Sequence, residues 1–223
     1  SMNPNARIES VLSEPLLTLG IEKDAKKRAQ RAKAMCNMVG LEESVLQKYP
    51  SEISGGQCQR VAIGRALITE PEIIVCDEVV SALDVSVQKT IIELIVKLQK
   101  EKNITIGFIC HDISLIQSCS HEVAVMYLGN VVEVLPAENL AEHAVHPYTR
   151  ALIGSIFDIG MDFSKPIEEI KGEAPSPLDV PAGCPFRGRC PKAMDRCAAE
   201  KPSLHQIGAD HEVACHLFDK EDK

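Results

Sequence analysis

The stretch Ser54-Gly55-Gly56-Gln57 comes immediately before a segment, about residues 57–69, whose apolar residues repeat at helical spacing. Two glycines at the start of a helix let the backbone approach a ligand closely. The N-terminus of the helix adds free N–H groups and a partial positive charge. An ordinary helix cap would also explain these four residues taken alone. Together with the segments that follow them, they favour a corner that binds phosphate.

The apolar run of residues 73–76 comes next and ends in two acidic residues, Asp77 and Glu78. A short, unbroken apolar run is typical of a strand buried on both faces of a parallel sheet. Its end delivers the two carboxylates to the edge where open α/β sheets bind ligands. Asp77 suits Mg²⁺, and Glu78 could orient or deprotonate an attacking water. Two acids that merely end a strand in solvent are the alternative interpretation.

Residues 87–100 predict a helix, and residues 104–110 predict a second buried strand that is followed at once by His111. A strand, a helix and a strand with this spacing form an α/β unit, so His111 should lie at the same sheet edge as the two acids. There it could contact a terminal phosphate, although a lone histidine after a strand is more often structural. Residues 123–127 and 131–135 predict a hairpin.

The composition limits the class of protein. The chain has 223 residues, a formal net charge of −8, 4% aromatic residues and no Trp. This length suits one medium domain, or one domain with an appendage. The acidic charge and the scarcity of stacking aromatics argue against nucleic acid as the main ligand. No apolar run approaches the ~20 residues of a membrane-spanning helix, and the N-terminus lacks a signal-peptide pattern, so we expect a cytoplasmic protein.

Four of the nine cysteines lie in a proline-rich C-terminal segment, at Cys184, Cys190, Cys197 and Cys215. Four thiolates can hold Zn²⁺ or an iron–sulfur cluster. The C-x2-C pairs usual at structural zinc are missing, which disfavours zinc, although three nearby histidines leave a mixed zinc site open. These histidines are His205, His211 and His216. Four reduced cysteines without a ligand are the plain alternative.

Residues 50–135 resemble the ATPase subunits of ABC transporters in four motifs that occur in the family's order. Residues 54–57 resemble the signature motif and residues 73–78 the Walker B motif. Residues 81–84 resemble the D-loop, and His111 the switch histidine. Each motif is short, but their combination is highly specific.

The subfamily resemblance rests on three further segments. Residues 82–88, residues 146–152 and the terminal cysteine segment together resemble the ATPases of oligopeptide/dipeptide importers, a group that also includes nickel importers. The opening residues 2–7 are similar to the segment just downstream of the Q-loop in that group. The likeness spans essentially the whole chain.

This resemblance implies an α/β fold, a truncated ABC-type nucleotide-binding domain with a small cysteine-containing C-terminal extension. Residues 1–70 would form the helical subdomain with the signature motif. Residues 71–135 would form a partial ATPase core with part of the parallel sheet. Residues 136–223 would form the peptide-importer extension with its four-cysteine cluster.

The resemblance also implies roles for single residues. Glu78 and His111 would be catalytic, and ATP and Mg²⁺ would be the cofactors of the complete subunit. The residues expected to contact nucleotide or its metal are Ser54, Gly55, Gly56, Gln57, Asp77 and Asp84. Some members of the group carry a [4Fe–4S] cluster in a similar tail, which places a cluster on Cys184, Cys190, Cys197 and Cys215 ahead of Zn²⁺.

Partners follow from how the family works. A second ABC ATPase subunit, identical or different, would pair head to tail with this one, so that each nucleotide lies between the P-loop of one subunit and the signature motif of the other. Transmembrane permease subunits would contact residues 1–50. We therefore expect the protein at the inner face of the cell membrane, held there through the permease.

One departure from the family pattern limits this expectation. The 223 residues contain no G-x-x-x-x-G-K-[ST] loop, the phosphate cradle of such ATPases. We expect the isolated chain to hydrolyse no ATP, to bind it weakly, and to leave an apolar edge or face of its sheet open. The alternative is a naturally truncated, non-catalytic binding module or pseudo-ATPase with a metal-binding tail. Soluble repair or chromosome ATPases are disfavoured by residues 146–152 and by the cysteine tail.

Overall fold

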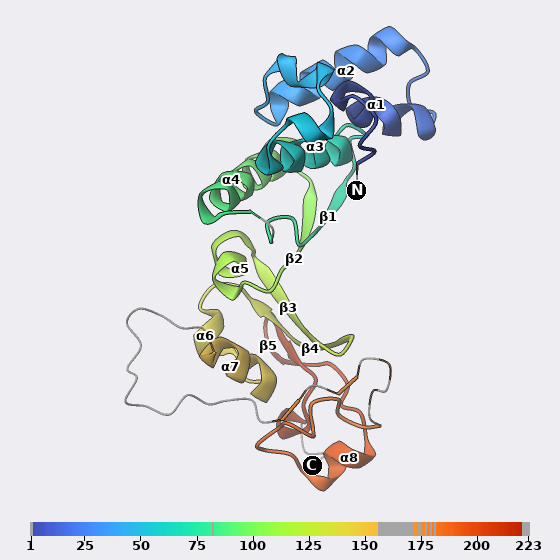
Figure 1. Ribbon diagram of the computed structural model, residues 1–223. Coiled ribbons are helices and arrows are strands. Elements are labelled where there is room, and N and C mark those ends of the chain that lie inside the picture. Colours follow the sequence, from blue (N-terminus) through green and yellow to red (C-terminus); the bar gives the residue numbers. More distant parts are fainter. Residues whose placement is uncertain are drawn as a thin grey trace. The chain divides into compact units, whose positions relative to one another are not determined.

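The computed structural model describes residues 2–81, 83–155, 172–173, 175–176, 178, 180 and 182–219. The chain forms two compact units, Ser1–His111 and Asp112–Lys223, coloured along the sequence in Figure 1. Ala82 of the expected D-loop and residues 156–171 of the expected extension lie outside the described residues. The three-part division at residues 70 and 135 stays a prediction.

Helices and short 3₁₀ turns make up the N-terminal part of the first unit. They are α1 (Ile8–Thr18), α2 (Ala25–Met38), η1 (Glu43–Gln47), η2 (Pro50–Glu52) and α3 (Gly55–Leu67). Ile8, Leu12 and Leu16 repeat every four residues in α1 and have no exposed surface. A Cβ placed on Gly64 of α3 would lie 3.1 Å from Leu12 Cδ2 and 3.1 Å from Met35 Cγ. The missing side chain therefore lets α1, α2 and α3 pack closely.

A two-stranded parallel sheet follows these helices in the first unit. Its elements are β1 (Ile73–Asp77), the connecting helix α4 (Val85–Lys102) and β2 (Thr105–Ile109). The register pairs Ile73 with Thr105 and Asp77 with Ile109, so both strands end at the same edge. The structure thereby confirms the strand–helix–strand unit and the partial parallel sheet.

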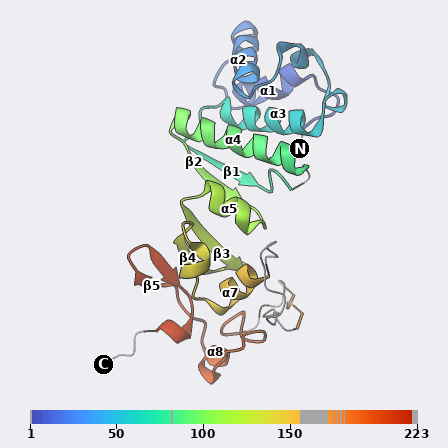
Figure 2. The same cartoon turned by 90° about the vertical axis from the view of Figure 1, so that its left-hand side faces the viewer.

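The two faces of this sheet differ. Helices α3 and α4 lie on one side of it in both views (Figures 1 and 2). On the other face Ile73 and Val75 are 65% and 66% exposed, and Ile109 is 53% exposed. The first unit therefore presents an apolar sheet face, which agrees with the expected open face. The expectation that β1 and β2 are buried on both faces is wrong for this chain, because helices cover one face only.

The second unit contains a four-stranded antiparallel sheet in the order β3-β4-β6-β5. Its strands are β3 (Glu122–Tyr127), β4 (Asn130–Pro136), β5 (His205–Gly208) and β6 (His211–Val213). The hairpin expected from the sequence is β3 and β4, and the sequence did not predict that the C-terminal strands would extend it. The helices are α5 (Ile113–Cys119), α6 (Leu140–His143), α7 (Pro147–Gly154) and α8 (Asp195–Ala199), with a final 3₁₀ turn η3 (His216–Phe218).

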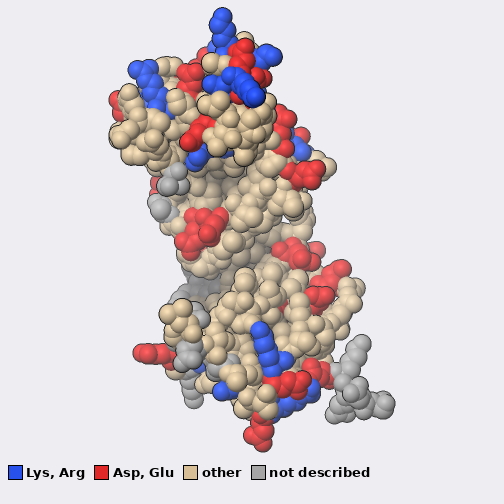
Figure 3. All heavy atoms as spheres, turned by 90° about the vertical axis from the view of Figure 1, so that its right-hand side faces the viewer, with Lys and Arg blue, Asp and Glu red and all other residues tan. Residues whose placement is uncertain are grey.

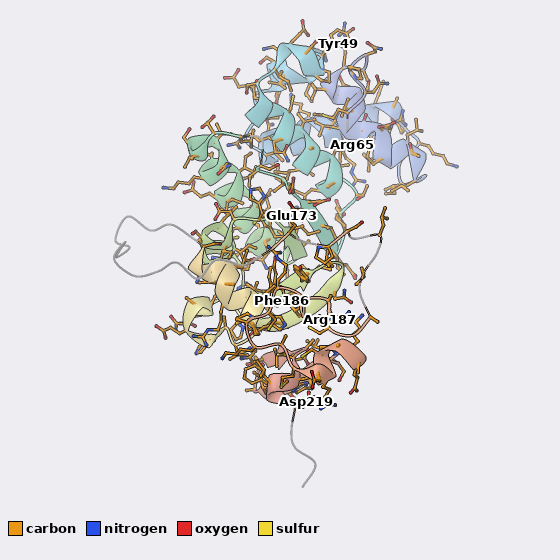
Figure 4. The ribbon with its side chains drawn as sticks, turned by 60° about the horizontal axis from the view of Figure 1, so that its bottom comes forward. Tyr49, Arg65, Glu173, Phe186, Arg187 and Asp219 are labelled. Carbon is orange, nitrogen blue, oxygen red and sulfur yellow. The ribbon has the colours of Figure 1, made fainter. Side chains whose placement is uncertain are left out.

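Phe186 anchors the cysteine-containing segment to the rest of this unit. It is 1% exposed and is labelled within the second unit in Figure 4. Its ring centroid lies 5.3 Å from that of Tyr127 on β3 and 5.4 Å from that of Tyr148 on α7. The two tyrosine rings lie 4.7 Å apart. Edge-to-face and tilted contacts of this kind add to the stabilisation that burial supplies.

A buried carboxylate, Glu133, connects three elements of the second unit. It lies on β4 and has no exposed surface. Its oxygens accept hydrogen bonds from the backbone N–H groups of Val145 (2.8 Å) and His146 (3.2 Å), and from Nε2 of His211 on β6 (2.9 Å). A carboxylate can remain buried when its oxygens are satisfied in this way. Glu133 thus joins β4 to the start of α7 and to the neighbouring strand β6 of the same sheet.

Among the residues that the structure describes, none of the helices combines the length and the apolar character needed to cross a membrane.

We predict that His146 makes the second unit less stable as the pH falls. Burial lowers the pKa of His146 to about 4, although the Glu133 carboxylate acts in the opposite direction. An unfolded histidine has a pKa of about 6.5, so between these values the unfolded chain binds a proton that the folded chain excludes. The free energy of unfolding should therefore fall as the pH drops through this window, by about 3 kcal/mol in total.

In the parent, Nδ1 of His146 accepts a hydrogen bond from the Tyr148 N–H at 3.1 Å, at the N-cap of α7. His146→Asn removes the titration and keeps a side-chain acceptor at this N-cap. Urea unfolding of both proteins from pH 7 to pH 4 should show the steeper loss in the parent. The exposed His143, replaced by Asn, is the control and should behave as the parent does. Parallel curves for the parent and H146N would contradict the prediction.

Candidate functional site

The signature-like corner is the N-terminus of α3. Ser54 is the N-cap; its Oγ accepts a hydrogen bond from the Gln57 N–H (3.3 Å), and Gln57 Oε1 accepts one from the Ser54 N–H (3.0 Å). This reciprocal pair is a capping box. Gly55 and Gly56 open the helix, where first-turn N–H groups have no carbonyl partner within the helix. The four residues therefore do cap a helix, and the same geometry leaves first-turn donors directed out of the helix end.

The two acids stand at the carboxyl end of β1. Asp77 is the last residue of the strand, and Glu78 follows it with a left-handed φ of 47°. A residue other than glycine held in this region costs about 1–3 kcal/mol, and such residues occur often at functional sites. The Glu78 N–H donates to the carbonyl of Ile109 at 2.9 Å. This bond fixes the turn to the end of β2.

His111 and Glu78 meet at this edge of the sheet. Nδ1 of His111 lies 3.7 Å from Oε1 of Glu78, and the two side chains are 77% and 59% exposed. The distance exceeds that of a hydrogen bond, so the two groups are close neighbours that could approach one bound ligand. The structure brings these two residues together as the parallel-strand argument predicts, whereas their catalytic roles stay predictions.

Asp84 begins α4. Its Oδ1 accepts hydrogen bonds from Ser86 Oγ (2.6 Å) and from the Val87 N–H (3.0 Å). These bonds, the one from Ser86 first, lower the pKa of Asp84. Asp84 is therefore an ionised helix cap, and its expected contact with a partner's nucleotide stays a prediction.

The signature-like corner packs against the start of α4. A Cβ on Gly55 would lie 3.7 Å from Leu83 Cδ2, and one on Gly56 would lie 2.8 Å from Val87 Cγ1. The second distance is too short for any real Cβ. The segment between Glu78 and Asp84 therefore runs from the strand tip to the glycine corner, within the first unit.

The four tail cysteines lie close to one another in the second unit. The pKa of the Cys215 thiol is raised to about 11, chiefly by burial, with smaller contributions in the same direction from the Cys184, Cys190 and Cys197 thiols. Burial also raises the pKa of Cys184, with added effects of Cys197 and Cys190, and the Cys184 N–H donates to the Cys197 carbonyl at 2.8 Å. In the described part of the chain, however, no three His, Cys, Asp or Glu side chains are placed so that they could hold a metal ion. The donor type fits a metal or cluster, and the placement does not.

Two residues that contribute to this architecture were given no individual role from the sequence, although Gln88 lies in the stretch 82–88 that resembles the subfamily. Gln88 in α4 contacts the backbone between Glu78 and Asp84, and Glu133 connects β4, β6 and α7. Both are single polar residues whose partners outside their own element are set by the path of a loop, for Gln88, or by the pairing of strands, for Glu133 and His211. An isolated Glu within the apolar run of β4 was the one available signal.

The chain matches two family models: ABC transporter over residues 1–81, and Oligopeptide/dipeptide transporter, C-terminal region, over residues 132–197. It is 43% identical over 221 residues to the oligopeptide transport ATP-binding protein OppF of Escherichia coli strain K12, covering 98% of this chain and 66% of that protein. It is 42% identical over 220 residues to the putative oligopeptide transport ATP-binding protein YkfD of Bacillus subtilis strain 168, covering 98% and 67%. The chain thus spans about two thirds of the length of these relatives.

A solved dimeric structure, a post-hydrolysis state of the ATP-binding cassette MJ0796 bound to ADP and Pi, matches with a TM-score of 0.55 and 30% identity. The match covers 61% of this chain and 59% of that one. The fold is therefore that of an ABC-type ATPase. Within this class, the chain belongs to the family of ATP-binding proteins of oligopeptide/dipeptide ABC transporters.

We predict that Gly56→Ala destabilises the first unit, because the new Cβ meets the β-branched Val87, which has little rotamer freedom. Overpacking of this kind costs about 1–3 kcal/mol. Gly55→Ala is the matched control, since its Cβ would make an ordinary contact with Leu83. Urea unfolding should show G56A less stable than G55A, and G56A/V87A should regain stability relative to G56A. Equal stability of the two single variants would refute the close contact.

Proposed function

We propose that this chain carries the signature, Walker B, D-loop and switch elements of an ATP-hydrolysing subunit that energises an ABC importer for oligopeptides or dipeptides. The observation that supports this most directly is the approach of His111 to Glu78, 3.7 Å apart at the carboxyl edge of β1 and β2. The contact of the α3 glycines with Leu83 and Val87 adds a second element to the same unit. Family membership supplies the reaction class.

In this proposal the acids and the histidine act on one nucleotide. Asp77 supplies an oxygen ligand for Mg²⁺, the type of donor this cation prefers. Glu78 orients the attacking water and accepts its proton, and His111 contacts the terminal phosphate beside it. Bound Mg-ATP provides the phosphoryl group and the charge that these residues handle.

The glycine corner serves a different nucleotide. Ser54, Gly55, Gly56 and Gln57 would face ATP held by the P-loop of a second ABC subunit, and Asp84 would contribute from the D-loop. First-turn N–H groups at a helix N-terminus suit this role because they attract phosphate. The solved dimer of a related cassette with ADP and Pi is consistent with pairing of this kind.

The contact with permease subunits is proposed for the helical part of the first unit. Leu17, Leu19 and Ile21, between α1 and α2, are 53%, 67% and 46% exposed. The next helix, α2, carries a basic run, and Lys and Arg side chains with Asp and Glu among them cover the helical part of the first unit in Figure 3. An apolar surface with charged residues beside it suits a protein partner. This contact would hold the subunit at the inner face of the cell membrane.

A pseudo-ATPase or binding module is the second candidate function. The 223 residues contain no P-loop sequence, so we propose that this chain, isolated, binds Mg-ATP only weakly. The backbone cradle and lysine of a P-loop supply much of the attraction for a triphosphate. Calorimetry that found micromolar affinity for the isolated chain would overturn this point.

We predict that Glu78→Gln lowers kcat by about 10²–10⁴-fold. The measurement uses a subunit that combines this chain with a P-loop segment and is assembled with its partner. The amide keeps the shape of the side chain but cannot take a proton from water. Glu72→Gln, an exposed residue just before β1, is the control and should leave kcat unchanged. Phosphate release measured over a range of ATP concentrations separates kcat from KM. Full activity of E78Q would exclude Glu78 as the base that accepts the proton of water.

We further propose the four-cysteine tail as a metal site, with a [4Fe–4S] cluster ahead of Zn²⁺. Support comes from the mutual proximity of the thiols from residues 184 to 215. Their positions in the described chain do not form a ligand set, so loading would require the thiols to rearrange. Ligand-free reduced cysteines are the competing outcome.

We expect anaerobic reconstitution with iron and sulfide to give a brown protein with visible absorbance and about four iron atoms per chain. Cys184→Ser combined with Cys197→Ser should abolish the absorbance. Cys119→Ser, outside the tail, is the control and should retain it. Elemental analysis that finds zinc instead would select the alternative metal, and a colourless, metal-free parent would reject the site.

A further inference from the structure

A single amide side chain, that of Gln88, bridges two carbonyl groups in the D-loop segment. Its Nε2 lies 3.0 Å from the carbonyl oxygen of Val80 and 3.0 Å from that of Leu83. Gln88 stands one turn into α4 and is half-buried. Because both partners are acceptors, the atom that faces them must be the NH₂ group, which has two hydrogens to donate.

Backbone hydrogen bonds fix the segment at its two ends. At the strand tip, the Glu78 N–H donates to Ile109, and both the N–H and the Oγ of Ser81 reach the Glu78 carbonyl, at 3.2 and 3.0 Å. At the helix end, Asp84 caps α4. Between these anchors the Leu83 N–H donates to the Val80 carbonyl at 3.1 Å and closes a turn. Gln88 binds both carbonyls of this turn and so ties it to the first turn of α4.

The path of this turn determines how the segment meets the glycine corner. Gln88 binds the carbonyl of Leu83, and the Leu83 side chain lies where a Cβ on Gly55 would contact it. Val87, which precedes Gln88 in α4, occupies the position that a Cβ on Gly56 would need. A shift of residues 80–83 would therefore change two separations together. One is the separation from Glu78, and the other is the separation from the N-terminus of α3.

We infer that Gln88 is a positioning residue, which keeps the D-loop segment in register with both Glu78 and the Ser54–Gln57 corner through its two hydrogen bonds to Val80 and Leu83. The inference rests on the proposed function, in that the segment then faces a nucleotide shared with a second subunit. A purely structural role would be to stabilise the first turns of α4. The two roles differ in what a substitution does locally and to turnover.

Two replacements of similar size remove the donor pair. Gln88→Leu takes away both hydrogen bonds, and Gln88→Glu places carboxylate oxygens opposite two carbonyl oxygens, which repel them. Gln99→Leu is the matched control: the same substitution in the same helix, at a half-buried glutamine whose side chain makes no hydrogen bond in the described part of the chain. If Q88L fails to fold, Q88E answers the same question.

The first measurement is hydrogen exchange on the 223-residue chain, which requires no ATPase activity. Amides of residues 79–87 should exchange about tenfold faster in Q88L and Q88E, with protection elsewhere in the first unit unchanged. Q99L should match the parent. Uniform loss of protection across the unit would reveal a merely structural role, and unchanged exchange of residues 79–87 would refute the inference.

The second measurement is steady-state ATP hydrolysis by the complete subunit assembled with its partner. Q88L and Q88E should lower kcat about tenfold and leave KM unchanged, because the residues that contact nucleotide are retained and only their alignment is lost. Faster local exchange with an unaltered kcat would refute the positioning role. If the parent assembly itself hydrolyses no ATP, the proposed function fails, and the exchange experiment still decides whether Gln88 holds the segment.

Discussion

The hydrogen bond from the Glu78 N–H to the Ile109 carbonyl is the contact on which the candidate site depends. It continues the pairing of β1 and β2 one residue beyond Asp77, so the strand tip cannot move independently of β2. It also holds Glu78 in a left-handed conformation that the residue would otherwise avoid. Because His111 comes just after β2, the same bond places the histidine beside the Glu78 carboxylate.

Side-chain size controls the second half of the site. Gly56 and Val87 leave no room between α3 and α4 for an added methyl group, so the glycine corner and the start of α4 behave as one packed unit. Gln88 adds hydrogen bonds to the segment before Asp84, where Val80 is buried and Leu83 lies beside Gly55. Steric and polar constraints thus act together on a stretch that would otherwise be mobile.

In the second unit, buried polar and aromatic groups supplement a core that is largely aliphatic. Glu133 satisfies two backbone N–H groups and His211, and Phe186 contacts both Tyr127 and Tyr148. These contacts hold the cysteine-containing segment against the sheet. The proximity of its four thiols is therefore a consequence of the fold around them and needs no metal to explain it.

Much of this protein could be predicted from local patterns in its sequence. The apolar runs of β1 and β2, the helical spacing of α3 and α4, and the order of the short motifs are properties of neighbouring residues, and they led to the α/β class, the family and the edge where Glu78 and His111 meet. Coordination geometry could not be predicted, because it depends on where each cysteine side chain lies in space. The tertiary structure alone decided that Glu133 binds a histidine 78 residues away, because the distance between them is determined by how whole elements pack and sequence spacing carries no record of it. Gln88 is only five and eight residues from Leu83 and Val80, but the path of the loop between them decides whether its amide reaches both carbonyls.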